Sequence, residues 1–208
     1  PLSKFVSFVI NRLFFKKNMK IGVLDIQGSV EEHFEALERL SIKPVLIKTS
    51  ADFEGIKGLI IPGGESTAIS KLLNWFDLKK DILEFSKGGR PIWGTCAGAI
   101  LLAKEVLDGK GVKGLKLMDI TVERNAYGRQ LDSFETELEF NFEAKKKKIP
   151  AIFIRAPQFV RIGAACKVLA QHKGEIVAVK EGGLLATSFH PELTNDLGVH
   201  EYFVRMCS

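Results

Sequence analysis

The chain has 208 residues, of which 46% are hydrophobic and 26% are charged, and its net charge is +5. This length suits one domain with one core, and the composition is that of an ordinary globular protein rather than a disordered or membrane-embedded one. Acidic and basic residues are mixed along the chain, so the small excess of positive charge does not indicate a nucleic-acid partner. The densest basic run, residues 145–148, is interpreted as a solvated loop.

Residues 1–18 differ from the rest because they are apolar and basic and include no acidic residue. The stretch is too short and too interrupted by polar residues to span a bilayer, and it offers no small-residue cleavage site of a secretory signal. Met19 then opens a regular strand pattern. We therefore expect residues 1–18 to be an extension that is not native to the fold, and residues 19–208 to form one domain. An amphipathic surface helix is the alternative for the extension.

The three cysteines, at positions 96, 166 and 207, cannot all pair within one chain, and none forms a CxxC motif. They therefore predict neither a disulfide framework nor a zinc site. A reducing, cytoplasmic setting is the location that this pattern favours.

Short apolar runs and helical periodicities alternate through the first half of the chain. Residues 20–26 predict a buried strand, and residues 30–40 predict a helix with one apolar face. Further strands are expected at 44–47, 58–61 and 90–93, with helices at 66–76, 78–85 and 97–106. From residue 120 strands predominate, at 134–140, 151–155, 176–180 and 184–189, before a last helix at 196–206. This order predicts an α/β fold, a three-layer sandwich with a mostly parallel sheet between helices on both faces.

The most informative stretch is residues 93–98, WGTCAG, which lies between an apolar strand and an apolar helix. Gly-x-Cys-x-Gly is the cysteine counterpart of the nucleophile elbow, in which the nucleophile occupies a strained strand-to-helix turn. Small neighbours are needed there because the backbone turns sharply. Cys96 is therefore the candidate nucleophile, with a buried cysteine beside a tight turn as the structural alternative.

A thiol nucleophile needs a base, and His190 is the best placed of the four histidines. It ends the last predicted strand, and functional sites of α/β sheets form at the carboxyl ends of strands. Glu192, two residues further on, can accept the other imidazole N–H and so fix the tautomer. His33, His172 and His200 are interpreted as surface or structural residues.

Acyl chemistry at a thiolate also requires N–H donors for the developing oxyanion. The N–H of Ala97, directly after the nucleophile, is one candidate. The second is Gly64, in the PGGEST segment that follows the predicted strand 58–61, since glycine lets a ligand approach the backbone closely. The structural alternative for this segment is a cap of the following helix by Ser66 or Thr67, and both roles can hold together.

Six segments together resemble the PdxT family, the glutaminase subunits of pyridoxal phosphate synthase, which are class I glutamine amidotransferases with a Cys-His-Glu triad. The resemblance runs from about Met19 to Ser208, and the GGEST segment is its most specific part. The six segments are 22–28 (GVLDIQG), 61–67 (IPGGEST), 94–98 (GTCAG), 124–130 (RNAYGRQ), 153–157 (FIRAP) and 189–193 (FHPEL).

The resemblance implies a flavodoxin-like sandwich that hydrolyses L-glutamine to glutamate and ammonia without a metal or organic cofactor. It also implies a partner, a synthase subunit that receives the ammonia and builds pyridoxal phosphate in a hetero-oligomeric complex. Arginine and glutamate side chains suit the α-carboxylate and α-ammonium groups of glutamine. By position, the residues implied to bind glutamine are Gly64, Glu65, Ser66, Arg124, Ile154 and Arg155.

Two other functions fit parts of the pattern. A cysteine hydrolase or peptidase could use the same elbow, but the GGEST segment and the His-Pro-Glu spacing argue against it. A catalytically silent regulatory subunit would be expected to lack one member of the triad, whereas all three are present here. Ammonia release from glutamine separates these possibilities.

Overall fold

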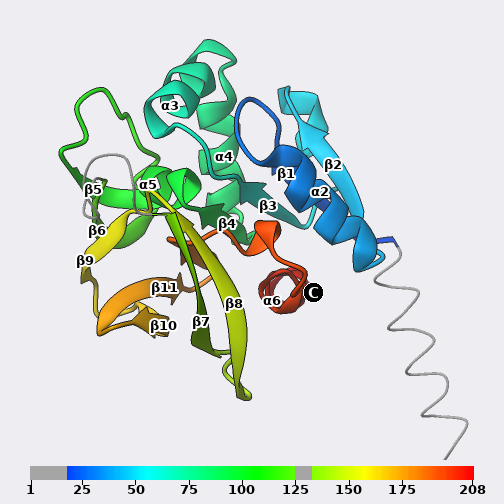
Figure 1. Ribbon diagram of the computed structural model, residues 1–208. Helices are drawn as coiled ribbons and strands as arrows, with labels where there is room; N and C mark the ends of the chain where they lie inside the picture. Colours follow the sequence, from blue (N-terminus) through cyan, green and yellow to red (C-terminus); the bar gives the residue numbers. More distant parts are fainter. Residues whose placement is uncertain (1–17, 125–132) are drawn as a thin grey trace, which may run out of the picture.

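The computed structural model describes residues 18–124 and 133–208, and its centre is a seven-stranded sheet (Figure 1). The strand order is β10-β11-β12-β4-β3-β1-β2. Strands from β12 to β2 pair in parallel, whereas β10, β11 and β12 pair antiparallel at one edge. The strands are β1 (Lys20–Leu24), β2 (Lys43–Ile47), β3 (Gly58–Ile61), β4 (Ile92–Thr95), β10 (Lys167–His172), β11 (Glu175–Glu181) and β12 (Leu184–Thr187).

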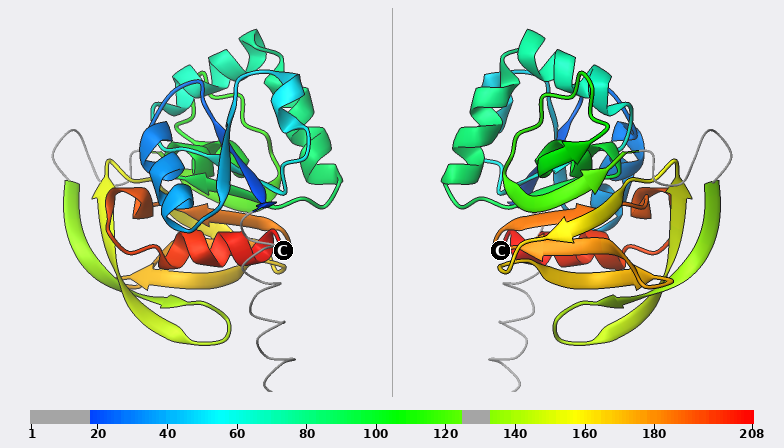
Figure 2. Two further views of the ribbon diagram at one scale, coloured as in Figure 1. Left: turned by 90° about the vertical axis from the view of Figure 1, so that its right-hand side faces the viewer. Right: turned by 90° about the vertical axis from the view of Figure 1, so that its left-hand side faces the viewer.

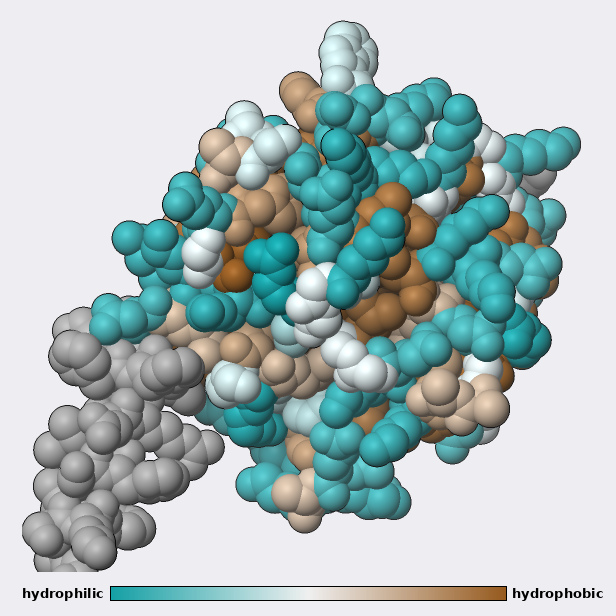
Figure 3. All heavy atoms as spheres, turned by 180° about the vertical axis from the view of Figure 1, so that it is seen from behind, coloured by the Kyte–Doolittle hydropathy of each residue, from teal (hydrophilic) through white to brown (hydrophobic). Residues whose placement is uncertain are grey.

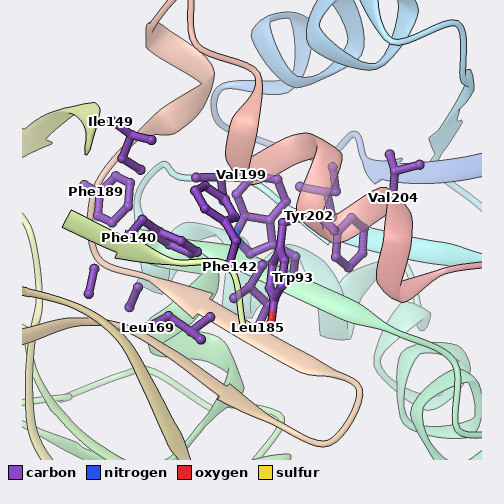
Figure 4. Close-up of a cluster of buried hydrophobic side chains, with 14 of the residues drawn as sticks. Trp93, Phe140, Phe142, Ile149, Leu169, Leu185, Phe189, Val199, Tyr202 and Val204 are labelled. Carbon is purple, nitrogen blue, oxygen red and sulfur yellow. The ribbon is translucent and has the colours of Figure 1, made fainter. Parts of the chain in front are cut away.

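Helices cover both faces of this sheet, as the alternation of elements predicts. On one face lie α2 (Val30–Arg39) and α6 (Gly198–Met206), and Trp93 of β4 packs there among Phe142, Val199 and Tyr202 (Figure 4). The other face carries α3, α4 and α5, whose apolar residues share a second core cluster with the strands. Their bounds are Ser66–Trp75, Leu78–Lys87 and Ala97–Leu102. The predicted α/β class with a mostly parallel sheet is confirmed.

Two smaller sheets flank the central one. β5 (Ala103–Leu107), β6 (Met118–Glu123) and β9 (Gln158–Ile162) form a three-stranded sheet. β7 (Ser133–Asn141) and β8 (Lys146–Ile154) form a long hairpin that curves past α6 (Figure 2). Its Phe140 ring lies 6.0 Å from that of Tyr202, so the hairpin closes the core over the last helix. Two short 3₁₀ helices, η1 (Ser50–Phe53) and η2 (Pro191–Leu193), complete the described elements.

Some predicted boundaries are wrong. The helix expected at 97–106 ends at Leu102, because Ala103–Leu107 pairs in parallel with β6 as strand β5. Such strand pairing between distant segments overrides local helical periodicity. The sequence patterns also do not indicate β6, β9 and β10. β6 and β9 pair with each other from distant parts of the chain. β10 pairs with the next strand, β11, but its own apolar run is short.

The basic run at 145–148 is also not a loop, because strand β8 begins at Lys146. Lys146 and Lys148 pair with Glu139 and Glu137 on the facing strand β7, at 2.7 and 3.8 Å. Lys147 reaches Asp196 at 2.6 Å. The lysine side chains are solvated as expected, but their pairing with glutamates on the facing strand stabilises this segment as a strand rather than a loop.

Polar side chains cover most of the face shown in Figure 3, with apolar side chains between them. Within residues 18–124 and 133–208, no helix has both the length and the apolar character needed to cross a membrane. Within the same ranges, no three His, Cys, Asp or Glu side chains gather as they would around a metal ion. Of the extension predicted at residues 1–18, all but Asn18 lies outside the described residues.

Candidate active site

Cys96 lies at the turn between β4 and α5 with a backbone φ of 46°, a conformation that L-residues rarely adopt. Gly94 and Gly98 make the turn possible. A Cβ at Gly94 would collide with the backbone of Gly98, and a Cβ at Gly98 would collide with the carbonyl of Ile61 on β3. The strained elbow expected from the sequence is therefore present in the structure.

The imidazole of His190 lies beside this cysteine. Strand β12 ends at Thr187, next to β4 in the sheet, and the chain then turns through His190 into η2. His190 Nδ1 is 2.7 Å from Glu192 Oε1, and the side chain of Glu192 is fully buried. The structure thus brings Cys96, His190 and Glu192 into one linked arrangement.

The surroundings of His190 favour its protonated form. Burial alone lowers the pKa of His190, but hydrogen bonds with Cys96 and Glu192 outweigh it and raise the pKa to about 10. Burial alone raises the pKa of Glu192, but the neighbouring His33 and the hydrogen bond with His190 lower it to about 2. Glu192 is therefore a carboxylate that accepts the Nδ1–H of His190, which leaves Nε2 for the thiol.

A pocket of about 600 Å³ opens in front of Cys96 and His190. Every residue that the sequence assigned to glutamine binding or to the oxyanion lines this pocket, whereas Glu192 lies behind His190 and outside it. The lining from these assignments is Gly64, Glu65, Ser66, Ala97, Arg124, Ile154 and Arg155. The Cys96 Sγ is 3.9 Å from the carbonyl oxygen of Ile154, which places the strand β8 end against the thiol.

Glu65 is held in two ways. Its carboxylate caps α3 by accepting from the N–H groups of Thr67 and Ala68, at 3.0 and 2.6 Å. The same carboxylate pairs with Arg124 at 3.2 Å. The helix begins at Ser66 as predicted, but Glu65 rather than Ser66 or Thr67 caps it, so the alternative interpretation of this segment names the wrong capping residue.

The loop after β1 forms another wall of the pocket that sequence motifs alone did not assign. Gln27 Oε1 accepts from the N–H of Glu65 at 2.8 Å, and the N–H of Ser29 donates to the carbonyl of Gly63 at 3.0 Å. Glu32, from the first turn of α2, also lines the pocket. The β1–α2 loop therefore fixes the backbone on which the proposed oxyanion donor Gly64 lies.

His33 and His200, interpreted from the sequence as surface or structural residues, are both fully buried, which excludes the surface alternative. His33 lies 3.6 Å from Glu192 and 3.0 Å from His200. His33 shares the buried face of α2 with Ala36 and Leu37. His33 lies four residues before Leu37, so helical periodicity places both on the same face of the helix, and this spacing could have indicated from the sequence that His33 is buried. His172, in contrast, is partly exposed at the end of β10.

A model of the SNO glutamine amidotransferase family matches residues 23–208. The chain belongs to this family. It is 48% identical over 188 residues to the pyridoxal 5'-phosphate synthase subunit PdxT of Thermotoga neapolitana, covering 90% of this chain and 99% of that one. It is 51% identical over 190 residues to PdxT of Dehalococcoides mccartyi, covering 90% and 97%. The family resemblance inferred from the motifs is confirmed.

Solved structures agree with this assignment. A crystal structure of a glutamine amidotransferase superposes with a TM-score of 0.84 at 43% identity, covering 90% of this chain and 98% of that one. PurLQS from Thermotoga maritima superposes with a TM-score of 0.69 at 15% identity, covering 91% and 99%, which supports the fold alone. Of the family segment at 124–130, only Arg124 lies within the described residues.

Proposed function

We propose that this SNO-family chain is a glutaminase that hydrolyses L-glutamine to glutamate and ammonia, with Cys96 as nucleophile, His190 as base and Glu192 as the residue that orients His190. The observation that carries the proposal is the buried Glu192–His190 hydrogen bond of 2.7 Å directed at a strained cysteine on the floor of a pocket. Base, orienting carboxylate and nucleophile have the mutual arrangement that covalent acyl transfer requires.

The reaction follows from these positions. His190 takes the proton of the Cys96 thiol, and the sulfur attacks the side-chain amide carbon of glutamine. The N–H groups of Ala97 and Gly64 donate to the oxyanion that forms. His190 returns the proton to the leaving nitrogen, which departs as ammonia and leaves a γ-glutamyl thioester. Water, deprotonated by His190, then cleaves the thioester to glutamate and restores the thiol.

Charged side chains at the pocket suit the amino-acid end of the substrate. Arg124 and Arg155 offer donors for an α-carboxylate, and Glu65 and Glu32 offer acceptors for an α-ammonium group. The Arg124–Glu65 pair would exchange part of its mutual contact for these two substrate groups. Gly64, Ser66 and Ile154 complete the proposed glutamine contacts.

We assign the ammonia to a synthase subunit, because the similar proteins named above are subunits of pyridoxal 5'-phosphate synthase. A glutaminase that feeds a partner gains from staying slow when alone. Release of the Ser29 N–H from the Gly63 carbonyl, followed by rotation of the Gly63–Gly64 peptide, would change which way the Gly64 N–H points. The partner should then raise kcat more than it lowers KM, since an oxyanion donor acts mainly in the transition state.

Ammonia release from glutamine, measured for the full chain alone and with a synthase subunit, tests the proposal. Hydrolysis that rises with the partner supports it. Cleavage of peptides without glutamine hydrolysis would mean a cysteine peptidase instead. No ammonia release under either condition would mean a silent regulatory subunit. Full activity of the chain alone would refute the partner-controlled switch while leaving the glutaminase assignment intact.

A further inference from the structure

Behind the proposed triad lies a buried polar cluster that the hydrolytic steps do not use. His33 Nε2 is 3.2 Å from Thr95 Oγ1 and 3.6 Å from Glu192 Oε2, and His33 Nδ1 is 3.0 Å from His200 Nε2. Both histidine side chains are fully buried. Glu192 Oε2 and His200 Nδ1 have no hydrogen-bond partner among the described residues. His33 therefore links the strand that carries the nucleophile, through Thr95, to the turn that carries the base, through Glu192.

Charge in the cluster is limited to the carboxylate. Burial lowers the pKa of His33 despite the attraction of Glu192, and burial lowers the pKa of His200 still further, so both rings are neutral near pH 7. The other charged groups that act on the pair are Glu32, which favours a charged His33, and Arg39, which disfavours a charged His200. Together with the nearby His190, these groups define the electrostatic surroundings of the cluster.

The contacts select one tautomer for each ring. If His33 carried its proton on Nδ1, the bare lone pair of Nε2 would face the carboxylate at 3.6 Å, and His200 would keep a buried N–H on Nδ1 with no acceptor. If both rings carry the proton on Nε2, His200 donates to His33, and His33 presents its N–H to Thr95 and Glu192. Of the ring nitrogens of these two histidines, only His200 Nδ1 is then left without a partner, and it carries a lone pair rather than a proton. Buried orphan donors are rarer than under-satisfied acceptors, so the second arrangement is favoured.

We infer that His33 is a positioning residue for Glu192. Its Nε2–H faces the carboxylate of Glu192 and keeps that carboxylate oriented toward His190, and the hydrogen bond from His200 to His33 Nδ1 fixes the tautomer of His33. This inference rests on the proposed glutaminase function. The contact at 3.6 Å is electrostatic rather than a hydrogen bond, and it acts on the carboxylate oxygen that His190 does not use. His33 does not line the pocket, so it acts on catalysis only through Glu192 and Thr95.

Two substitutions at one position test this role in the full chain with its synthase subunit. His33→Leu fills the space but has no N–H, whereas His33→Gln can place an amide N–H near the position of Nε2 and an amide oxygen near His200. Tyr202→Phe is the matched control, because Tyr202 is buried on the same helix as His200 and its ring packs beside Phe140 and Phe142. The measurements are kcat and KM for glutamine against pH.

We expect His33→Leu to lower kcat about tenfold or more with KM within about twofold, as is usual when a group that orients a catalytic residue is lost. The acid limb of its kcat–pH profile should move to higher pH, because loss of the Nε2–H that faces the carboxylate favours protonation of Glu192, and a protonated Glu192 no longer accepts from His190. His33→Gln should recover most of kcat and bring the acid limb of the profile back toward its position in the unmodified chain. Tyr202→Phe should match the unmodified chain in both. A folded His33→Leu with unchanged kcat and acid limb would overturn the inference, as would a His33→Gln no better than His33→Leu.

Nitrogen NMR of the histidine rings in the unmodified chain gives a readout that needs no activity. Nε2–H tautomers of His33 and His200 are expected near pH 7, and an Nδ1–H or a charged His33 would overturn the inference even if His33→Leu fails to fold. An unmodified chain that releases no ammonia from glutamine would sink the proposed function, whereas the tautomers would still report on the cluster. The two failures are therefore distinguishable.

Discussion

Glu192→Gln keeps the shape of the side chain but removes the charge on which the proposed base depends. The amide cannot satisfy both of its neighbours. With its oxygen toward His190, its NH₂ group faces the N–H that we assign to His33. With its NH₂ toward His190, the amide imposes the tautomer that puts a proton on Nε2 and removes the base from Cys96. Either orientation weakens the 2.7 Å contact that directs the imidazole.

The size of the effect follows from the kind of bond that is lost. A hydrogen bond to a charged partner contributes roughly 1.5–3 kcal/mol, and the upper end applies to this pair, because both side chains are buried. At about 1.4 kcal/mol per tenfold in rate, this loss lowers kcat about 100-fold, and a population of the wrong tautomer lowers it further, toward about 10⁴-fold.

The assay is ammonia release in the presence of the synthase subunit, with KM expected to stay within about twofold because Glu192 does not line the pocket. Glu181→Gln is the control, since Glu181 accepts from the backbone N–H of Asp119 in a different part of the chain. A folded Glu192→Gln that retains more than a tenth of the unmodified kcat would refute the orienting role.

Three further predictions concern the same site and the start of the chain. Cys96→Ala should abolish glutamine hydrolysis and Cys166→Ala should not, as measured by ammonia release; the reverse result would mean that the wrong cysteine was chosen. Deletion of residues 1–18 should leave hydrolysis unchanged, and a large loss in the same assay would place the extension at the site. The melting temperature should fall as pH drops from about 4.5 toward 2, where the carboxylate of Glu192 is protonated. It should also fall as pH rises from about 6.5 through 10, where the stabilised proton of His190 is lost; melting curves in which Glu192→Gln shows the same two losses would contradict this.

Local patterns in the sequence predict the central sheet well. Its parallel strands are continuous apolar runs, because both faces of a parallel sheet are covered, and the helices between them show a clear apolar face. The three-stranded sheet is predicted poorly, since β5 and β9 owe their form to pairing with β6 rather than to any period of their own. Residue 103, where α5 gives way directly to β5, carries no glycine or proline that would signal the change.

The buried histidines show a different limit of sequence reasoning. A histidine on a helix is compatible with solvent, with a core or with a site, and its neighbours in sequence do not separate these cases. His33 lies on the apolar face of α2, but its partners Thr95, Glu192 and His200 come from three other parts of the chain. Only the folded arrangement shows that four polar side chains occupy one buried volume.

The position of the site in the sheet explains which of its parts the motifs could predict. β12, β4, β3 and β1 are neighbours, and the turns after their carboxyl ends supply His190, Cys96, Gly64 and Gln27. Each of these residues follows a recognisable strand, so strand prediction and chemistry suffice to bring them together. Some of the residues proposed to recognise the substrate have another origin, because Arg124 follows β6 and Ile154 ends β8 in the smaller sheets. The proposed chemical step therefore depends on the regular core, whereas the part of glutamine recognition that Arg124 and Ile154 supply depends on long-range pairing that only a family resemblance could indicate beforehand.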